Sequence, residues 1–197
     1  SRIDTCKPEF LETLKKAGVN WLGLGIENPN NVIRKEVHKD SYKEVKIIDV
    51  VNLIREQDIN VAANYIFGLP EETEESLNFT YSFAEETNSE MVNFYCAMAY
   101  PGTELYNYAI KEGLPLPNNW SGFGQYAADI LPLPSKYISS TEILSFRDEA
   151  FIEYFTHPPY LRLIEKTFGT NAVDFVEAIV KIGKPPRVLL AGATSTD

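Results

Sequence analysis

The amino-acid sequence predicts an α/β protein in which buried strands alternate with amphipathic helices. Three short apolar segments have the composition of strands: 21–26, 60–67 and 92–99. Equivalent strand positions, Leu22, Val61 and Val92, lie 39 and 31 residues apart, and a helical pattern fills each gap. This spacing is typical of right-handed βαβ crossovers, which build a parallel sheet. We therefore expect the first hundred residues to form βα units.

The helices are predicted from apolar periodicity and from residues that start or stop a helix. Gly18 is a natural C-terminal stop, Asp40 or Ser41 is expected to cap the second helix, and Thr73 the third. The predicted helices cover 7–18, 41–57, 73–87, 103–112, 141–156, 159–168 and 171–182.

Residues 113–136 interrupt this pattern with four prolines and several turn residues. The aromatic residues Trp120, Phe123 and Tyr126 are expected to anchor the segment as an ordered loop or lid. The chain is thus predicted to have two regions: βα units over 1–106, and a lid-like loop with C-terminal helices over 107–197.

Composition excludes several classes of protein. The 197 residues carry a net charge of −10, which disfavours binding to nucleic acid, because an acidic surface repels phosphate. The apolar runs are far shorter than the roughly 18 to 20 residues that span a bilayer. We expect a globular, cytoplasmic protein without a membrane span. Cys6 and Cys96 are the two cysteines, too few for a disulfide framework or a cysteine-rich metal site.

Polar residues at the ends of the predicted strands are candidates for a binding site, because ligands bind beyond the carboxyl ends of parallel strands. Glu27 follows the first strand, and it could equally be a helix-start carboxylate. Asn64 lies within an apolar strand, where a polar side chain needs a partner. The acidic run 71–75 lacks the ligand spacing of a calcium loop and is expected to decorate a helix N-terminus.

Four segments together resemble the C-terminal half of a radical S-adenosylmethionine (SAM) enzyme. They are Arg-Ile-Asp at 2–4, Gly-Ile-Glu-Asn at 25–28, Ile-Phe-Gly-Leu-Pro-Glu-Glu-Thr at 66–73 and Tyr-Pro-Gly-Thr-Glu-Leu-Tyr at 100–106. The resemblance is closest to the branch with an N-terminal cobalamin-binding domain, which includes the anaerobic magnesium-protoporphyrin monomethyl ester cyclases.

The resemblance implies a partial six-stranded (β/α) barrel whose first half holds a 4Fe–4S cluster on a Cys-x3-Cys-x2-Cys loop. SAM binds the cluster, and its cleavage yields a radical that abstracts hydrogen from a small-molecule substrate, here a bulky one such as a tetrapyrrole. Because two cysteines cannot supply that loop, the chain looks like strands four to six plus a C-terminal extension. It is expected to be inactive alone, and cobalamin is a possible cofactor of the parent.

Five residues match positions that contact SAM in the family. By position, Glu27 matches a fourth-strand polar contact, Asn64 a ribose-binding residue and Lys39 a basic residue that pairs with the SAM carboxylate. Ile66 and Gly68 match the turn whose backbone lies against adenine. Carboxylate, amide and ammonium groups suit these partners chemically. No catalytic residue and no metal ligand is assigned to this chain.

Two other functions remain open at this stage. The region could be a non-catalytic interaction module, or an unrelated half-barrel enzyme that uses Glu27 and Glu72 as acid and base. A Cys-x3-Cys-x2-Cys motif upstream of Ser1 would favour the radical SAM hypothesis over both. If strands one to three precede this chain, segment 21–26 is an exposed apolar edge, and we expect the fragment to self-associate.

Overall fold

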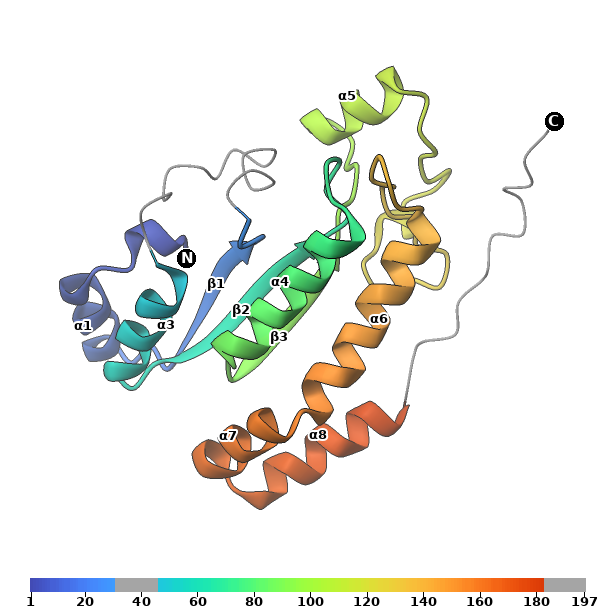
Figure 1. Ribbon diagram of the computed structural model, residues 1–197. Helices are drawn as coiled ribbons and strands as arrows, with labels where there is room; N and C mark the ends of the chain where they lie inside the picture. The colour runs from blue at the N-terminus through green and yellow to red at the C-terminus, as the bar shows by residue number, and fades with distance from the viewer. Residues whose placement is uncertain (31–45, 183–197) are drawn as a thin grey trace.

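The computed structural model describes residues 1–30 and 46–182. Its strands and helices are the predicted ones, with ends that differ by a few residues (Figure 1). The predicted cap at Asp40 or Ser41 lies outside the described residues. The elements are α1 (Pro8–Lys16), β1 (Trp21–Glu27), α3 (Ile47–Glu56), β2 (Asn60–Phe67), α4 (Glu74–Thr87), β3 (Met91–Cys96), α5 (Glu104–Lys111), α6 (Ser140–Thr156), α7 (Pro158–Phe168) and α8 (Thr170–Ile182).

The three strands form a parallel sheet in the order β1-β2-β3, which confirms the α/β prediction. Leu22 pairs with Val61 as expected, but Val92 pairs with Ala63, so the predicted equivalence of Val92 and Val61 is wrong. The shift is two residues, which leaves every β3 side chain on its predicted face. β3 also ends before the predicted limit, because the Ala97 carbonyl accepts a hydrogen bond from Leu133 of the following loop.

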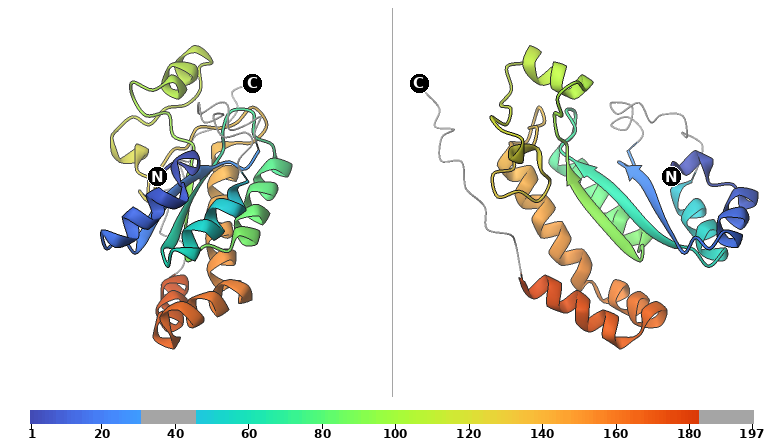
Figure 2. Two further views of the ribbon diagram at one scale, coloured as in Figure 1. Left: turned by 90° about the vertical axis from the view of Figure 1, so that its left-hand side faces the viewer. Right: turned by 180° about the vertical axis from the view of Figure 1, so that it is seen from behind.

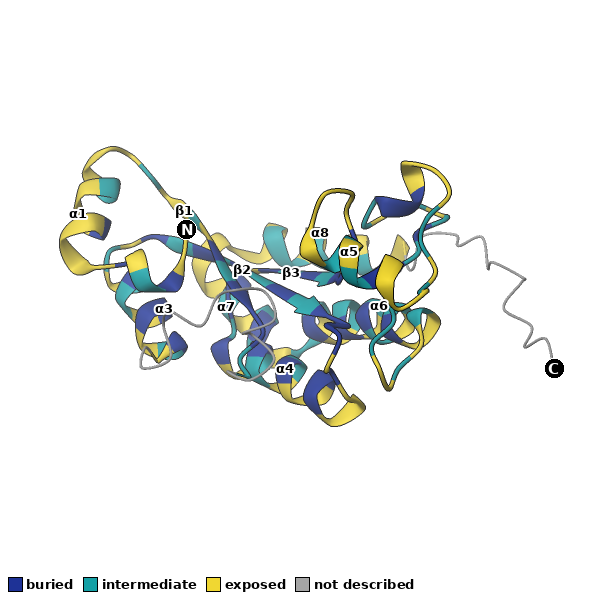
Figure 3. Ribbon diagram, turned by 90° about the horizontal axis from the view of Figure 1, so that it is seen from above, coloured by how far each residue is buried: buried dark blue, intermediate teal, exposed yellow. Residues whose placement is uncertain are grey.

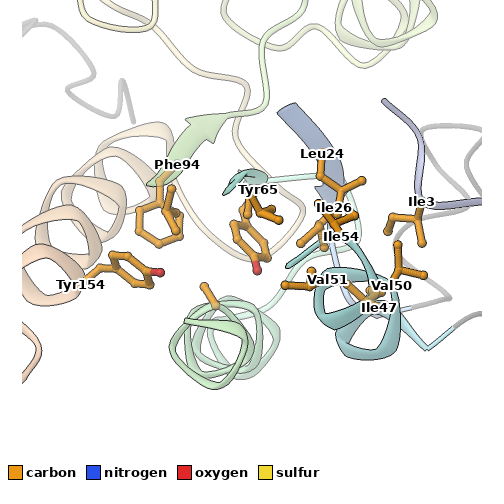
Figure 4. Packing of buried hydrophobic residues seen from close by; sticks show 14 of the residues in the cluster. Ile3, Leu24, Ile26, Ile47, Val50, Val51, Ile54, Tyr65, Phe94 and Tyr154 are labelled. Carbon is orange, nitrogen blue, oxygen red and sulfur yellow. The ribbon is translucent and has the colours of Figure 1, made fainter. Parts of the chain in front are cut away.

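One face of the sheet carries the main core. Side chains alternate along β2, and Val61, Ala63, Tyr65 and Phe67 are buried. The ribbon shows helix α4 in front of the sheet, with the strands and helices coloured by burial in the view from above (Figures 1 and 3). Close up, the strand residues pack against α3 on one side and against α6 on the other (Figure 4). The helices of 107–197 thus share one core with the strands of 1–106.

Buried polar contacts hold the core together near the starts of β2 and β3. The Tyr154 hydroxyl on α6 donates to the Ser89 carbonyl at 2.8 Å. Glu90 accepts from Arg55 Nε at 2.8 Å and from the Val61 N–H at 2.9 Å, so its carboxylate joins α3, β2 and the start of β3. Because both Glu90 oxygens are used, the buried charge is compensated.

The other face of the sheet is more open. The register aligns Gly25, Asn64 and Asn93 in one row and Gly23, Ala62 and Met91 in the next. These positions alternate with the buried ones and are half-buried or exposed. Seen from behind, the sheet presents this face to the viewer, with α6 beside it and α8 below (Figure 2, right). In a closed barrel, this face would be the inside.

The outer edge of β1 is partly covered by the first residues of the chain. Arg2 forms a parallel bridge with Gly25, the Gly25 N–H donates to the Ser1 carbonyl at 3.1 Å, and the Ser1 ammonium donates to Gly23. Arg2 thus extends the sheet by one residue, whereas Ile3–Thr5 form a short 3-10 helix. The prediction of a fully unpaired apolar edge is wrong, because Ser1 and Arg2 satisfy part of the edge and because Leu24 and Ile26 point into the core.

The loop over 113–136 is anchored differently from the prediction. Phe123 is buried, but Trp120 and Tyr126 are 80% and 59% exposed. The anchor is a polar one: the Gln125 side chain bonds both the N–H and the carbonyl of Cys96, at 3.0 and 2.9 Å. Of the three aromatic anchors that were predicted, only Phe123 is buried, and the side-chain amide of Gln125 holds the loop in place of the other two.

Candidate functional site

Glu27 ends β1 in a strained backbone conformation. Its φ of +64° lies in the left-handed region, and the pairing with β2 shifts register between Gly25 and Glu27. A non-glycine residue at such an angle costs on the order of 1–3 kcal/mol, and residues of this kind cluster at functional sites. The side chain is buried at the C-terminal edge of the sheet, where the sequence predicted a binding residue.

Asn64 lies on the open face, in the middle of the sheet. Its Nδ2 donates to the Leu24 carbonyl at 3.3 Å, and its Oδ1 accepts from Asn93 Nδ2 at 2.9 Å. The partner that a polar residue in an apolar strand needs is therefore Asn93, a residue that sequence reasoning missed. The sequence did contain a signal for Asn93, because this residue interrupts an apolar strand just as Asn64 does.

Gly68 and Ile66 form the turn after β2. Gly68 has φ +85°, and a Cβ at this position would lie 2.8 Å from the Ile143 side chain of α6. Glycine is thus required by the backbone angle and by α6 packing. Ile66 is half-buried on the open face and packs against the small cluster around Leu69 and Ala97. The contact of this turn with adenine stays a prediction.

Glu72 is fully buried, so the prediction that the whole acidic run decorates a helix N-terminus is wrong for this residue. Its Oε2 accepts from the N–H groups of Gly68 and Leu69 at 2.6 and 3.1 Å, and its Oε1 accepts from Asn28 Nδ2 at 2.7 Å. The carboxylate therefore joins the end of β1 to the turn after β2. A carboxylate near a helix start is usually solvated, but Glu72 is buried because the N–H groups of the turn donate to it.

The structure brings four of the five predicted cofactor-binding residues to the C-terminal halves of β1 and β2 and to the turn after β2. These are Glu27, Asn64, Ile66 and Gly68, while Lys39 lies outside the described residues. Beside them the backbone is accessible, because a Cβ at Gly23 would meet no atom within 4 Å. Amide and carboxylate groups next to open backbone fit the ribose and amino groups of SAM.

The cysteines of this chain do not fit the role of ligands to an iron–sulfur cluster. Cys6 and Cys96 are both buried, and burial raises the pKa of the Cys6 thiol, which disfavours the thiolate that binds iron. Among residues 1–30 and 46–182, no group of three or more His, Cys, Asp or Glu side chains is placed to hold a metal ion. With two cysteines in the whole sequence, the chain cannot supply the three of a Cys-x3-Cys-x2-Cys loop.

Arg147 on α6 is a buried cation beside the loop. Its Nε donates to Asp148 at 2.7 Å, its Nη1 donates to the Gln125 carbonyl at 3.1 Å, and the guanidinium lies 5.6 Å from the centre of the Tyr126 ring. Although Tyr126 is 59% exposed, desolvation by the groups packed around it is the main cause of its raised pKa, followed by the nearby Tyr95. These contacts fasten the loop to α6 beside the open face.

No helix in the described part of the chain is long and apolar enough to cross a membrane. Residues 1–84 match the Radical SAM superfamily. The chain is 27% identical over 161 residues to an uncharacterized methyltransferase of Pyrococcus horikoshii, covering 82% of this chain and 34% of that protein. It is 32% identical over 102 residues to the anaerobic magnesium-protoporphyrin IX monomethyl ester cyclase of Cereibacter sphaeroides, covering 50% and 16%.

A solved structure shows the same fold. Coproporphyrinogen III oxidase (HemN) from Escherichia coli, which is a radical SAM enzyme, superposes with a TM-score of 0.52 at 20% identity, over 84% of this chain and 31% of that one. The chain thus spans about a third of the lengths of HemN and the Pyrococcus protein. The predicted relationship to radical SAM enzymes and the predicted partial-barrel fold are confirmed.

Proposed function

We propose that this chain, a relative of radical SAM enzymes over residues 1–84, is the part of such an enzyme that binds SAM and one side of the substrate. The observation that carries the proposal is the polar row Gly25–Asn64–Asn93 on the open sheet face, next to the strained end of β1. The 4Fe–4S cluster and SAM, when bound, supply a radical that abstracts hydrogen. The cluster ligands lie in another part of the parent protein.

Each proposed SAM contact uses the chemistry of one side chain. Asn64 binds the ribose hydroxyls, Glu27 accepts hydrogen bonds from SAM donor groups, and Lys39 pairs with the SAM carboxylate. The turn at Ile66 and Gly68 lies against adenine. Asn93 and Glu72 hold these groups in place through their bonds to Asn64 and to the turn.

The proposed substrate is a bulky small molecule such as a tetrapyrrole. Support comes from the names of two relatives, the magnesium-protoporphyrin cyclase and coproporphyrinogen III oxidase. Residues 1–106 supply the barrel strands, and residues 107–197 supply the loop and helices beside them. Cobalamin as a further cofactor of the parent and a cytoplasmic location belong to the proposal. The first rests on the resemblance of the motifs and the second on the composition.

The alternative of acid–base chemistry with Glu27 and Glu72 is disfavoured by the contacts of Glu72. A general base must reach the proton that it removes, yet the Glu72 carboxylate is fully buried and accepts three hydrogen bonds from Asn28, Gly68 and Leu69. Its role is to hold the two strand ends together.

The experiment that tests the proposal starts from the coding sequence upstream of Ser1. We expect a Cys-x3-Cys-x2-Cys motif there, and we expect the protein that includes it to cleave SAM to 5′-deoxyadenosine after anaerobic reconstitution with iron and sulfide. The 197-residue chain, treated identically, should neither hold a cluster nor cleave SAM. A parent that carries the motif and yet releases no 5′-deoxyadenosine would favour the non-catalytic module.

We also propose that the isolated chain self-associates. The main support is the open sheet face, around which Trp21, Met91 and Phe175 are exposed. The β1 edge gives weaker support, because Ser1 and Arg2 partly cover it. A two-fold dimer would cover such a face with one self-complementary patch.

A further inference from the structure

A cavity of about 520 Å³ lies between the lower half of the open sheet face and the C-terminal helices. Trp21, Met91 and Asn93 line it from the sheet, and α6, α7 and α8 close it from the other side with mainly aromatic and aliphatic side chains. The volume is within the range of small-molecule sites, about 300–1,000 Å³. This space lies towards the N-terminal ends of the strands, on the face that the proposed dimer would cover, whereas the proposed cofactor contacts lie towards the C-terminal ends.

The lining offers no charge to a ligand. Its one charged residue is Glu90, whose two carboxylate oxygens already accept from Arg55 and from the Val61 N–H. The Tyr160 hydroxyl in the wall donates to the Glu90 carbonyl at 3.4 Å. An ionic group in this cavity would lose its hydration without a partner, which is strongly unfavourable. The chemistry of the walls therefore selects an uncharged ligand.

The walls also favour flat rings. Trp21 and Phe168 stack with their ring centres 5.6 Å apart and their planes 7° from parallel. Phe175 on α8 is 67% exposed although it lines the cavity, and no residue of α8 is buried. The apolar side chains of α8 beside the cavity therefore expose surface that a ligand can bury. Aromatic faces pack best against other rings.

The cavity reaches the proposed cofactor site through one hydrogen bond. Asn93 lines the cavity and at the same time donates to Asn64, the proposed ribose contact, at 2.9 Å. We propose that the cavity takes the uncharged, ring-bearing apolar part of the substrate, with the reacting end of the substrate on the Asn64 side. The assignment to the substrate rests on the proposed function, whereas the chemistry of the ligand follows from the walls alone.

The test uses the 197-residue chain and two fluorescent probes with the same pair of aromatic ring systems. N-phenyl-1-naphthylamine is uncharged, and 8-anilinonaphthalene-1-sulfonate carries a sulfonate. We expect the uncharged probe to bind with one-to-one stoichiometry and at least about tenfold more tightly than the sulfonate. Equal affinities, or binding of several probe molecules per chain, would overturn the proposal.

Two variants locate the probe. Ala172→Trp fills the cavity from α8, and Ile179→Asp places a charge in its wall. We expect each to weaken binding of the uncharged probe by more than about tenfold, while Ile110→Trp, at an exposed position on α5 that does not line the cavity, leaves it unchanged. Should Ala172→Trp not fold, by circular dichroism, Ile179→Asp decides alone. Unchanged binding in a folded variant would refute the assignment.

Two further measurements separate the remaining explanations. Because the proposed dimer would cover the same face, probe and second copy should compete, and sedimentation equilibrium should show the probe-saturated chain shifted towards the monomer. A probe-saturated chain that dimerises as strongly as the free chain would place the probe outside the cavity and overturn the proposal. Probe binding requires neither SAM nor a cluster. Failure of the parent to cleave SAM would therefore remove the proposed function and leave the ligand chemistry of the cavity standing, whereas failure of probe binding would remove only the cavity assignment.

Discussion

Asn28 Nδ2 donates to Glu72 Oε1 at 2.7 Å, and this buried hydrogen bond ties the end of β1 to the turn after β2. Two segments that come from different βα units, and that carry the proposed SAM contacts Glu27 and Gly68, are thereby held at a fixed spacing. The same carboxylate accepts two backbone N–H groups of the turn. Its removal would take an acceptor away from three buried donors.

The first prediction follows from those three donors. Glu72→Ala should lower the free energy of unfolding by about 3 kcal/mol, because each unsatisfied buried donor costs about 1–3 kcal/mol. Glu75→Ala, in the same acidic run but exposed, should change it by less than about 1 kcal/mol. Urea unfolding of both variants measures the difference. Similar midpoints for the two would mean that the Glu72 bonds contribute little.

The second prediction uses the direction of the Asn28–Glu72 bond. Glu72→Gln alone places two amide N–H groups against each other, because Asn28 already uses its Oδ1 for the Asn30 N–H. Adding Asn28→Asp supplies an acceptor to the new amide and should recover more than half of the stability lost in the single variant. A double variant less stable than Glu72→Gln would contradict this geometry. The measurement is a double-mutant cycle in urea.

The third prediction concerns SAM binding by the cluster-bearing parent protein. Asn64→Ala should weaken binding by about 0.5–1.5 kcal/mol, and Lys39→Ala by about 1.5–3 kcal/mol, since a charged hydrogen bond is stronger than a neutral one. Glu27→Ala should act in the same direction. Asn78→Ala, on the exposed side of α4, is the control. Calorimetric titrations in which Asn64→Ala and Lys39→Ala bind as the parent does would remove both residues from the site.

The fourth prediction is a pH dependence at the start of α6. Ser139 and Glu142 form a capping box, and the hydrogen bonds from Ser139 lower the pKa of the Glu142 carboxyl. A lowered pKa in the folded state means that the contribution is present above the unfolded pKa and is lost as the pH falls through the folded one. Glu142→Gln should therefore lower Tm at pH 7 but not near pH 3. A Tm difference that is the same at both pH values would contradict the capping role.

The fifth prediction tests self-association through the open face. Sedimentation equilibrium should show species heavier than the 22.3 kDa chain as concentration rises. Phe175→Glu, at the exposed apolar rim, should shift the equilibrium towards the monomer, while Phe79→Glu, exposed on α4 on the helix-covered side of the sheet, should not. A strict monomer at every concentration would show that the face stays uncovered. A dimer unaffected by Phe175→Glu would place the interface elsewhere.

The elements could be predicted because their signals are local. Apolar periodicity, the Thr73 cap and the glycine stops specify where helices and strands run, and all three survive in the structure. The position of Glu27 at the C-terminal end of β1, and of Asn64 on the neighbouring strand, followed from strand order and direction alone. Topology was thus accessible from spacing, without knowledge of any contact.

The contacts that complete the site could not be predicted, because they depend on which side chain a buried donor meets. Glu72 and its neighbours in 71–75 look alike in the sequence, yet only the position of Asn28 and the turn makes Glu72 the buried one. Gln125 and Arg147 hold the loop through contacts with residues far along the chain. The sequence pattern of a single helix or strand does not indicate which distant residues will form a hydrogen bond.

The contact between Tyr154 and Ser89 has a consequence for how the chain folds during synthesis. Its partners are 65 residues apart, and Tyr160 meets Glu90 across 70 residues. Loops of this length close slowly, because many chain conformations must be given up before the contact forms. While α6 and α7 are still inside the ribosome, Phe94 and Tyr65 have no cover from that side. The newly made sheet is then the segment that chaperones would be expected to bind, until the last helices emerge.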